Sequence, residues 1–127
     1  MSVAYLDTHV AVYLHDGLLE EFSSEAKRQL EANDLLISPM VLLEFSYLFK
    51  RKRIGVDAKA LFTALTTSFG VALCPFPFAA VVHEALDMDW TQDPFDRLIV
   101  AHATVNHQAK LITRDRLIRR HYGNAVW

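Results

Sequence analysis

Four acidic residues occupy positions from which their carboxylates could gather at one site instead of pointing separately into solvent. They are Asp7, Glu44, Asp96 and Asp115. Asp7 ends a short apolar run at 3–6, and Asp115 closely follows another at 111–113. Such runs are typical of buried parallel strands. In open α/β sheets, ligands bind beyond the carboxyl ends of the strands. We therefore expect both aspartates at one rim of a sheet.

The other two acids lie on apolar faces of predicted helices. Glu44 follows Val41 by three residues and precedes Leu48 by four, which places all three on one helical face. Asp96 precedes the apolar residue Ile99 by three, near the start of another predicted helix. A carboxylate on an apolar face is costly unless it is paired or binds a cation. These two acids are therefore candidates for the same site.

Each acid taken alone also has an ordinary structural explanation. Glu44 could reach water from the edge of its stripe. Asp93 and Asp96 could form a capping box, and Asp115 could cap the next helix. Taken together, however, four carboxylates without a cysteine partner offer the hard oxygen ligands that Mg²⁺ and Mn²⁺ prefer. We assign the capping role to Asp93 and the functional role to Asp96.

Short apolar runs alternate with helical patterns, which predicts an α/β sandwich with a mainly parallel central sheet. Strands are expected at 3–6, 35–37, 71–74, 111–113 and 125–127. Helices are expected from about 8 to 15, 24–32, 39 to the basic segment at 50–53, 58–67, 78–86, 94–105 and shortly after 115. Capping residues and glycines mark most of these boundaries.

The composition fits one domain, residues 1–127, because 127 residues with 52% hydrophobic side chains can build a two-sided core. The single cysteine, Cys74, permits no intrachain disulfide and no thiolate metal site, and it fits a reducing cytoplasmic environment. Nothing at the N-terminus indicates a signal peptide. The uncharged stretch 60–83 is long enough to span a bilayer, but Gly70, Pro75 and Pro77 interrupt it, so we interpret it as core rather than as a membrane segment.

Positive charge is concentrated locally although the net charge is −2. Eight of the 13 lysines and arginines fall in two clusters, which are Lys50–Arg53 and the group Arg114, Arg116, Arg119 and Arg120. Local basic patches can bind phosphates whatever the net charge. Cations also suit helix C-termini, so the charges alone leave both interpretations open.

Four motifs in order carry a resemblance to a known family. They are Leu6-Asp7-Thr8-His9, Leu43-Glu44-Phe45, Asp93-Pro94-Phe95-Asp96-Arg97-Leu98-Ile99-Val100-Ala101 and Leu111-Ile112-Thr113-Arg114-Asp115. Over the whole chain they resemble the successive motifs of PIN domains. They are most similar to those of the VapC toxins of bacterial and archaeal type II toxin–antitoxin systems. The segment from Asp93 to Ile99 and the strand-end Thr113 to Asp115 are the most specific parts.

The resemblance implies an endoribonuclease that uses Mg²⁺ or Mn²⁺ and a metal-activated water to hydrolyse RNA. It implies that the metal-binding and catalytic residues are Asp7, Glu44, Asp96 and Asp115. It further implies a homodimer and a VapB-like antitoxin as partner. Thr8 and Thr113 fit a supporting role in which they orient carboxylates or waters.

RNA that crosses an acidic site needs flanking cations along its backbone. Arg114 and Arg116 flank Asp115 and are therefore the predicted nearer RNA contacts. Lys50–Arg53 lies about two helical turns beyond Glu44, and we leave it as a distal RNA patch or as a surface that faces the antitoxin.

Three other polar residues are less defined by the sequence. His9 could contact the site because it lies near Asp7. His102 is expected to be structural, and the role of Arg97 is open.

The homodimer has a candidate surface on the helices predicted at 39–50 and 58–67. Their apolar side chains could exceed what one small core covers. These side chains are Phe45, Phe49, Leu61, Phe62 and Leu65. The alternative is that all five are interior.

Three other functions compete with the ribonuclease. A structure-specific DNA nuclease could use the same acids, and a non-catalytic RNA-binding module could keep them, although intact acids argue against it. A phosphatase or receiver domain could form an aspartyl phosphate. It is disfavoured because His9 stands two residues after Asp7, where haloacid-dehalogenase-like enzymes have a second carboxylate.

Overall fold

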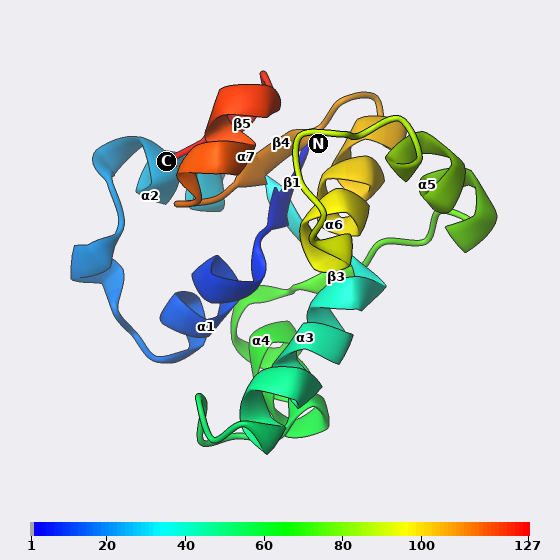
Figure 1. Cartoon of the computed structure of the whole chain (residues 1–127). Coiled ribbons are helices and arrows are strands. Elements are labelled where there is room, and N and C mark those ends of the chain that lie inside the picture. Colours follow the sequence, from blue (N-terminus) through cyan, green and yellow to red (C-terminus); the bar gives the residue numbers. More distant parts are fainter. Residues whose placement is uncertain (1) are drawn as a thin grey trace.

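The computed structural model describes residues 2–127, which surround one central sheet (Figure 1). The sheet has five strands in the order β3-β2-β1-β4-β5, and every pair is parallel. The strands are β1 (Val3–Leu6), β2 (Asp34–Ile37), β3 (Ala72–Leu73), β4 (Lys110–Ile112) and β5 (Ala125–Val126). This arrangement confirms the predicted α/β class with a parallel sheet.

Helices connect the strands at close to the predicted positions. They are α1 (Thr8–His15), α2 (Ser24–Ala32), α3 (Pro39–Lys50), α4 (Ala58–Phe69), α5 (Phe78–Ala85), α6 (Pro94–Val105) and α7 (Arg116–His121). A short 3₁₀ helix, η1 (Leu19–Glu21), lies between α1 and α2 and was not predicted. Strand β3 is two residues long, shorter than the predicted run 71–74.

Side-chain caps explain where the helices begin. Ser23 accepts a hydrogen bond from the backbone N–H of Ala26, and Asp57 caps α4 in the same way. Gly17 and Gly70 follow α1 and α4 with φ angles of 72° and 69°, a left-handed conformation that favours glycine.

The order of the strands divides the helices into layers. Along the chain, the connections from β1 to β2 and from β2 to β3 each move to the next strand in one direction across the sheet. The connection from β3 to β4 crosses back in the opposite direction. Right-handed crossovers therefore put α2 and the pair α5–α6 on opposite faces, as Figure 1 shows. Helices α3 and α4 pack together beyond the carboxyl ends of the strands, where they form a projecting lobe.

The core corrects one prediction about the surface. Phe45, Leu61 and Leu65 are almost completely buried, so they belong to the interior and not to an exposed dimer face. Phe49 is exposed and Phe62 is half-buried. The interior face of α3 is set by its contacts with α4 and α6.

Within residues 2–127, no helix has both the length and the apolar character needed to cross a membrane. The stretch 60–83 is divided among α4, β3 and α5, with Gly70 and two prolines between them.

Candidate active site

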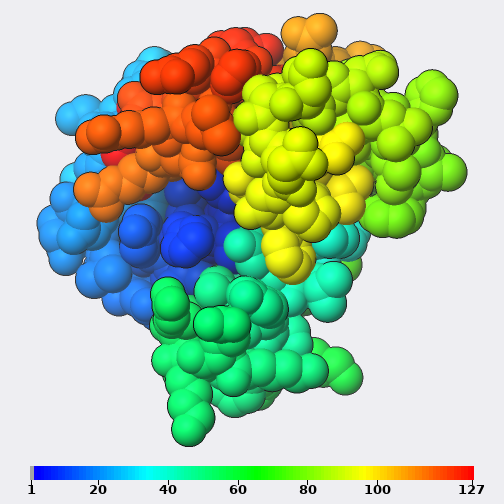
Figure 2. Space-filling model, in the orientation of Figure 1, coloured from blue at the N-terminus to red at the C-terminus, as the bar shows by residue number. Residues whose placement is uncertain are grey.

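A pocket opens at the carboxyl ends of the central strands, between the sheet and the α3–α4 lobe. Its volume is about 450 Å³. The lining residues are Asp7, His9, Tyr13, Glu44, Asp93, Asp96, Arg114 and Asp115. Figure 2 shows a hollow with blue N-terminal residues at its floor, ringed by orange, yellow and teal segments. The structure thus brings the four predicted acids together from four separate segments.

Asp7 is the most deeply buried of the four, with 7% of its surface exposed. It caps α1, and its Oδ1 accepts a hydrogen bond of 2.8 Å from the backbone N–H of Thr8. Its Oδ2 accepts a second bond, of 2.6 Å, from the hydroxyl of Thr113 beside the end of the neighbouring strand β4. Burial raises the pKa of the Asp7 carboxyl, and the two hydrogen bonds oppose that rise. The parallel pairing of β1 with β4 therefore fixes this carboxylate in one orientation.

Glu44 reaches the pocket from α3, whose neighbouring residue Phe45 is buried in the core. The hydroxyl of Thr8 donates a hydrogen bond to Glu44 Oε1. Burial and the nearby charge of Asp7 raise the pKa of the Glu44 carboxyl, whereas this hydrogen bond lowers it. Thr8 thus contacts Asp7 through its backbone and Glu44 through its side chain, as expected for a residue that orients carboxylates.

Asp93 and Asp96 both line the pocket at the start of α6, and Asp93 also caps the helix, which is the role predicted for it. Asp93 Oδ1 accepts hydrogen bonds from the backbone N–H groups of Phe95 and Asp96, so Asp93 is the cap. Asp96 stands among acids: burial, followed by the charges of Asp93, Asp7, Asp115 and Glu44, raises the pKa of its carboxyl to about 7.

Asp115 combines the two roles that the sequence left as alternatives. It lines the pocket, and it also caps α7, because its Oδ1 accepts hydrogen bonds from the backbone N–H groups of Leu117 and Ile118. The Thr113 hydroxyl accepts a bond of 3.0 Å from the Asp115 backbone N–H while it donates to Asp7. One threonine therefore links the ends of two carboxylate-bearing segments.

Besides Asp93, two lining residues were not among the predicted metal-binding acids or RNA-binding arginines. His9 is exposed at the rim, as its position near Asp7 allowed. Tyr13 was missed. It follows His9 by four residues, and this helical spacing could have placed it on the same face of α1.

His102 and Arg97 have contacts outside the pocket. The buried His102 ring contacts the hydroxyl of Ser38 at 2.7 Å, and burial lowers the pKa of this histidine. The guanidinium of Arg97 donates to the backbone oxygens of Ala85 and Leu86 at the end of α5. Both residues hold helices together and do not line the pocket.

The two arginines that flank Asp115 differ in their surroundings. Arg114 lines the pocket, forms an ion pair of 3.1 Å with Glu21 and lies over the ring of Trp127. Arg116 is exposed at the start of α7.

The donor set of the pocket fits a hard divalent cation. Among residues 2–127, the four acids form no ion pair with a lysine, arginine or histidine, although the charge of His9 lowers the pKa values of Asp7 and Glu44 and Arg114 lines the same pocket. In the same residues, no three acidic, histidine or cysteine side chains are close enough to ligate one ion together. Mg²⁺ keeps several waters and is commonly held by one or two carboxylates. The carboxylates therefore fit a cation that is bound partly through water.

The fold and the pocket define a class: a parallel α/β domain with carboxylates gathered at the carboxyl ends of its strands. The sequence model of the PIN domain family matches residues 4–124. The chain belongs to this family.

A solved structure shares the fold. The chain is similar to one in the crystal structure of VapBC2 from Rickettsia felis bound to a DNA fragment from their promoter. The TM-score is 0.62 at 19% identity, and the alignment covers 98% of this chain and 96% of the other. The comparison with curated protein sequences found no match.

Proposed function

We propose that this protein is a metal-dependent endoribonuclease and the VapC-like toxin of a type II toxin–antitoxin pair. The observation that carries the proposal is the convergence of Asp7, Glu44, Asp96 and Asp115 on one pocket in a PIN domain. The proposed cofactor is Mg²⁺ or Mn²⁺, and the proposed reaction is hydrolysis of an RNA phosphodiester bond.

The chain's own residues would hold the ion in a defined position. A carboxylate offers about four acceptor directions, and Asp7 uses one on each oxygen for Thr8 and Thr113. The remaining directions are available to a cation without loss of the hydrogen bonds that orient the group. Glu44 keeps one oxygen, Oε2, outside its bond to Thr8. A bound divalent cation supplies positive charge at the phosphate and makes a water more acidic.

The backbone of the substrate would contact the arginines near Asp115. Both arginines are exposed, but Arg114, which lines the pocket, is already engaged by Glu21 and Trp127. We therefore assign the larger part of phosphate binding to Arg116. Arg114 would contribute only if it exchanged its ion pair with Glu21 for a phosphate.

Two partners belong to the proposal. The solved structure that shares the fold is a VapBC complex, which supports a VapB-like antitoxin for this chain. A homodimer is proposed through the apolar groove between α3 and α4, which is lined by Leu42, Leu43 and Phe62. Light scattering at tens of micromolar, a range set by typical interface affinities, should then give twice the mass of the chain.

Cleavage assays test the activity directly. Purified protein should cut single-stranded RNA in the presence of Mg²⁺ or Mn²⁺, should be inactive with EDTA, and should leave matched DNA intact. Cleavage of branched or flap DNA in place of RNA would identify a structure-specific DNA nuclease. Binding of RNA without cleavage at any metal concentration would identify a non-catalytic module.

A further inference from the structure

One stripe of α3 joins the acidic pocket to the basic segment Lys50–Arg53. Glu44, Tyr47 and Arg51 follow one another at spacings of three and four residues, so they lie along one face of the helix end. The stripe covers about 10 Å at the usual helical rise. An RNA strand that leaves the pocket along this face would contact the ring of Tyr47 first and the cations Lys50–Arg53 next.

The aromatic residue of the stripe, Tyr47, is exposed, and its ring lies near a second ring and a guanidinium. Tyr47 has 49% of its surface exposed. The ring of Phe95, the residue before Asp96, lies with its centroid 6.3 Å from that of Tyr47 at a tilt of 42°. The guanidinium carbon of Arg51 lies 5.4 Å from the centroid of the Tyr47 ring. An exposed ring flanked by a second ring and a guanidinium is the combination that unpaired bases stack on.

We propose that Tyr47, with Phe95 and Arg51, is a stacking platform for an unpaired nucleobase next to the cleaved phosphate. The base takes the place of the Arg51 guanidinium over the Tyr47 ring, and Arg51 turns to the neighbouring phosphate. This exchange is favourable because a cation–π contact at an exposed site is weaker than a stack of a base on an aromatic ring. The assignment rests on the proposed nuclease function and adds that its substrate is single-stranded at this position.

Charge complementarity favours a nucleic acid strand over an apolar partner at this stripe. Beyond Tyr47 the chain carries four consecutive cations, Lys50 to Arg53, all exposed. The apolar groove of α3 and α4 adjoins the stripe, because its lining residue Leu43 precedes Tyr47 by four residues. Tyr47 itself is not among the residues that line the groove.

Single-base deletions in the ligand test the platform. The protein is the Asp7→Asn variant, which is expected to bind without cutting. The probe is a short fluorescent RNA in which one base at a time is replaced by an abasic sugar. Anisotropy should show one abasic position that weakens binding by roughly five- to a hundredfold, the range of a base–aromatic stack. Adding Tyr47→Leu should weaken binding of the intact RNA by a similar factor and remove the sensitivity to that abasic position. Tyr47→Phe should keep it.

Two further variants separate stacking from charge and from general surface effects. Arg51→Gln should reduce the slope of log affinity against log salt by about one, while the abasic position stays sensitive. Phe78→Leu removes another exposed aromatic ring, 54% exposed on α5, and should leave both readouts unchanged.

The possible failures are distinguishable. If the Asp7→Asn protein binds no RNA at all, the proposed function fails and the platform fails with it. If it binds RNA but the abasic pattern is the same with and without Tyr47→Leu, only the platform is overturned. If Tyr47→Leu changes the mass in light scattering while the abasic pattern is kept, the stripe is an interface between copies and the platform is wrong.

Discussion

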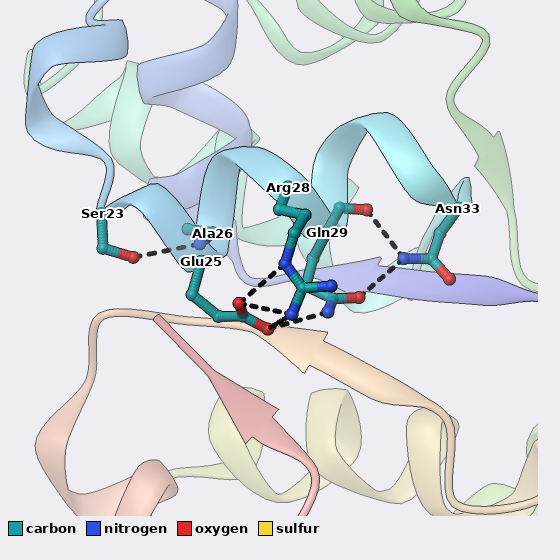
Figure 3. Close-up of polar contacts among 6 residues, drawn as sticks. All are labelled: Ser23, Glu25, Ala26, Arg28, Gln29 and Asn33. Carbon is teal, nitrogen blue, oxygen red and sulfur yellow. Dashed lines mark hydrogen bonds and ion pairs between the residues drawn. The ribbon is translucent and has the colours of Figure 1, made fainter.

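The carboxylate of Glu25 on α2 and those of the acidic pocket have opposite surroundings. Glu25 accepts hydrogen bonds from the guanidinium of Arg28 at 2.6 to 3.0 Å and from the side-chain amide of Gln29 at 2.9 Å (Figure 3). Arg28 and then Gln29 lower the pKa of Glu25. In the pocket, burial is the largest cause of the raised pKa values of Asp7, Glu44 and Asp96.

The network on α2 is complete by itself. Asn33 donates to the backbone oxygen and the side-chain oxygen of Gln29 and accepts a bond from the hydroxyl of Ser2 (Figure 3 shows the first two). Each of these side chains thus has at least one hydrogen-bond partner within the chain. Among residues 2–127, the pocket carboxylates that Thr8 and Thr113 orient form no ion pair with a lysine, arginine or histidine. The comparison separates a carboxylate whose pKa is lowered by partners within the chain from carboxylates whose pKa values are raised by burial and neighbouring charges, a pattern that is frequent at functional sites.

The largest expected effect is the loss of cleavage in Asp7→Asn. The amide keeps the size of the side chain but removes the charge that would bind the metal. Rates should fall about a hundredfold or more, which corresponds to about 3 kcal/mol of transition-state stabilisation. The measurement is the initial rate of RNA cleavage at saturating Mg²⁺, with Glu25→Gln as the matched control that should cleave at the wild-type rate. Cleavage by Asp7→Asn at the wild-type rate would remove Asp7 from the site.

Metal should stabilise the fold through the pocket and not through α2. A ligand that binds only the native state at about a hundred times its dissociation constant adds about 2.7 kcal/mol. The melting midpoint of wild-type protein should therefore rise with millimolar Mg²⁺ or Mn²⁺ and return to its starting value with EDTA. Glu25→Gln should show the same rise and Asp7→Asn a much smaller one. An equal rise in Asp7→Asn would place the ion elsewhere.

Much of the fold and of the site follows from local sequence rules. The caps Ser23, Ser38, Asp57 and Asp93 and the glycines after α1 and α4 set boundaries that neighbouring residues decide. Asp7 and Asp115 were predictable as neighbours because parallel strands end at one rim. Glu44 and Asp96 were predicted from their places on apolar helix faces, and the resemblance to PIN domains joined the four acids into one set. That they line one pocket is seen in the structure, whereas their metal-binding role stays a prediction.

The misses concern contacts between distant segments. The sequence of α3 has apolar residues on several faces, and only its packing with α4 and α6 decides that Phe45 is buried while Tyr47 is exposed. In the same way, Arg97 binds backbone oxygens at the end of α5, and Arg114 pairs with Glu21, which lies far away in the sequence. Side-chain partners of this kind depend on the assembled tertiary structure and leave no periodic signal.

The raised pKa of Asp96 should appear in the pH dependence of stability without metal. Its carboxyl titrates near its usual value of 3.8 in the unfolded chain and at about 7 in the native protein. Between these values the native state binds more protons, so the free energy of unfolding falls as pH rises from about 4 to about 7.

Asp96→Asn should flatten this fall by about 1 to 2 kcal/mol, a value discounted for the partial exposure of the group. Other groups also contribute to the pH dependence of stability. The lowered pKa of His102 makes the free energy of unfolding rise with pH below about 6.5, and the raised pKa values of Asp7 and Glu44 make it fall. Because these groups are present in both proteins, the difference between the two curves reports mainly on Asp96. Urea titrations at a series of pH values, with EDTA present, measure it. Parallel curves for wild type and Asp96→Asn would show that the pKa of Asp96 is not raised by burial and neighbouring charges.

The smallest effect is expected for Arg28→Gln, which removes the cation from the network on α2. Glu25 and Arg28 are both well exposed, and ion pairs between exposed side chains contribute little to stability. The pKa of Glu25 should rise toward its usual value of 4.5, because its first cause of lowering is lost while the bond from Gln29 remains. Carboxyl chemical shifts followed by NMR through the acidic range measure this rise. Cleavage and the response to Mg²⁺ should be those of the wild type, since Arg28 is not among the residues that line the pocket. If Mg²⁺ no longer raised the melting midpoint of Arg28→Gln, the network on α2 and the pocket would be coupled. The distinction between Glu25, which is neutralised within the chain, and the pocket carboxylates, which are proposed to bind a cation, would then fail.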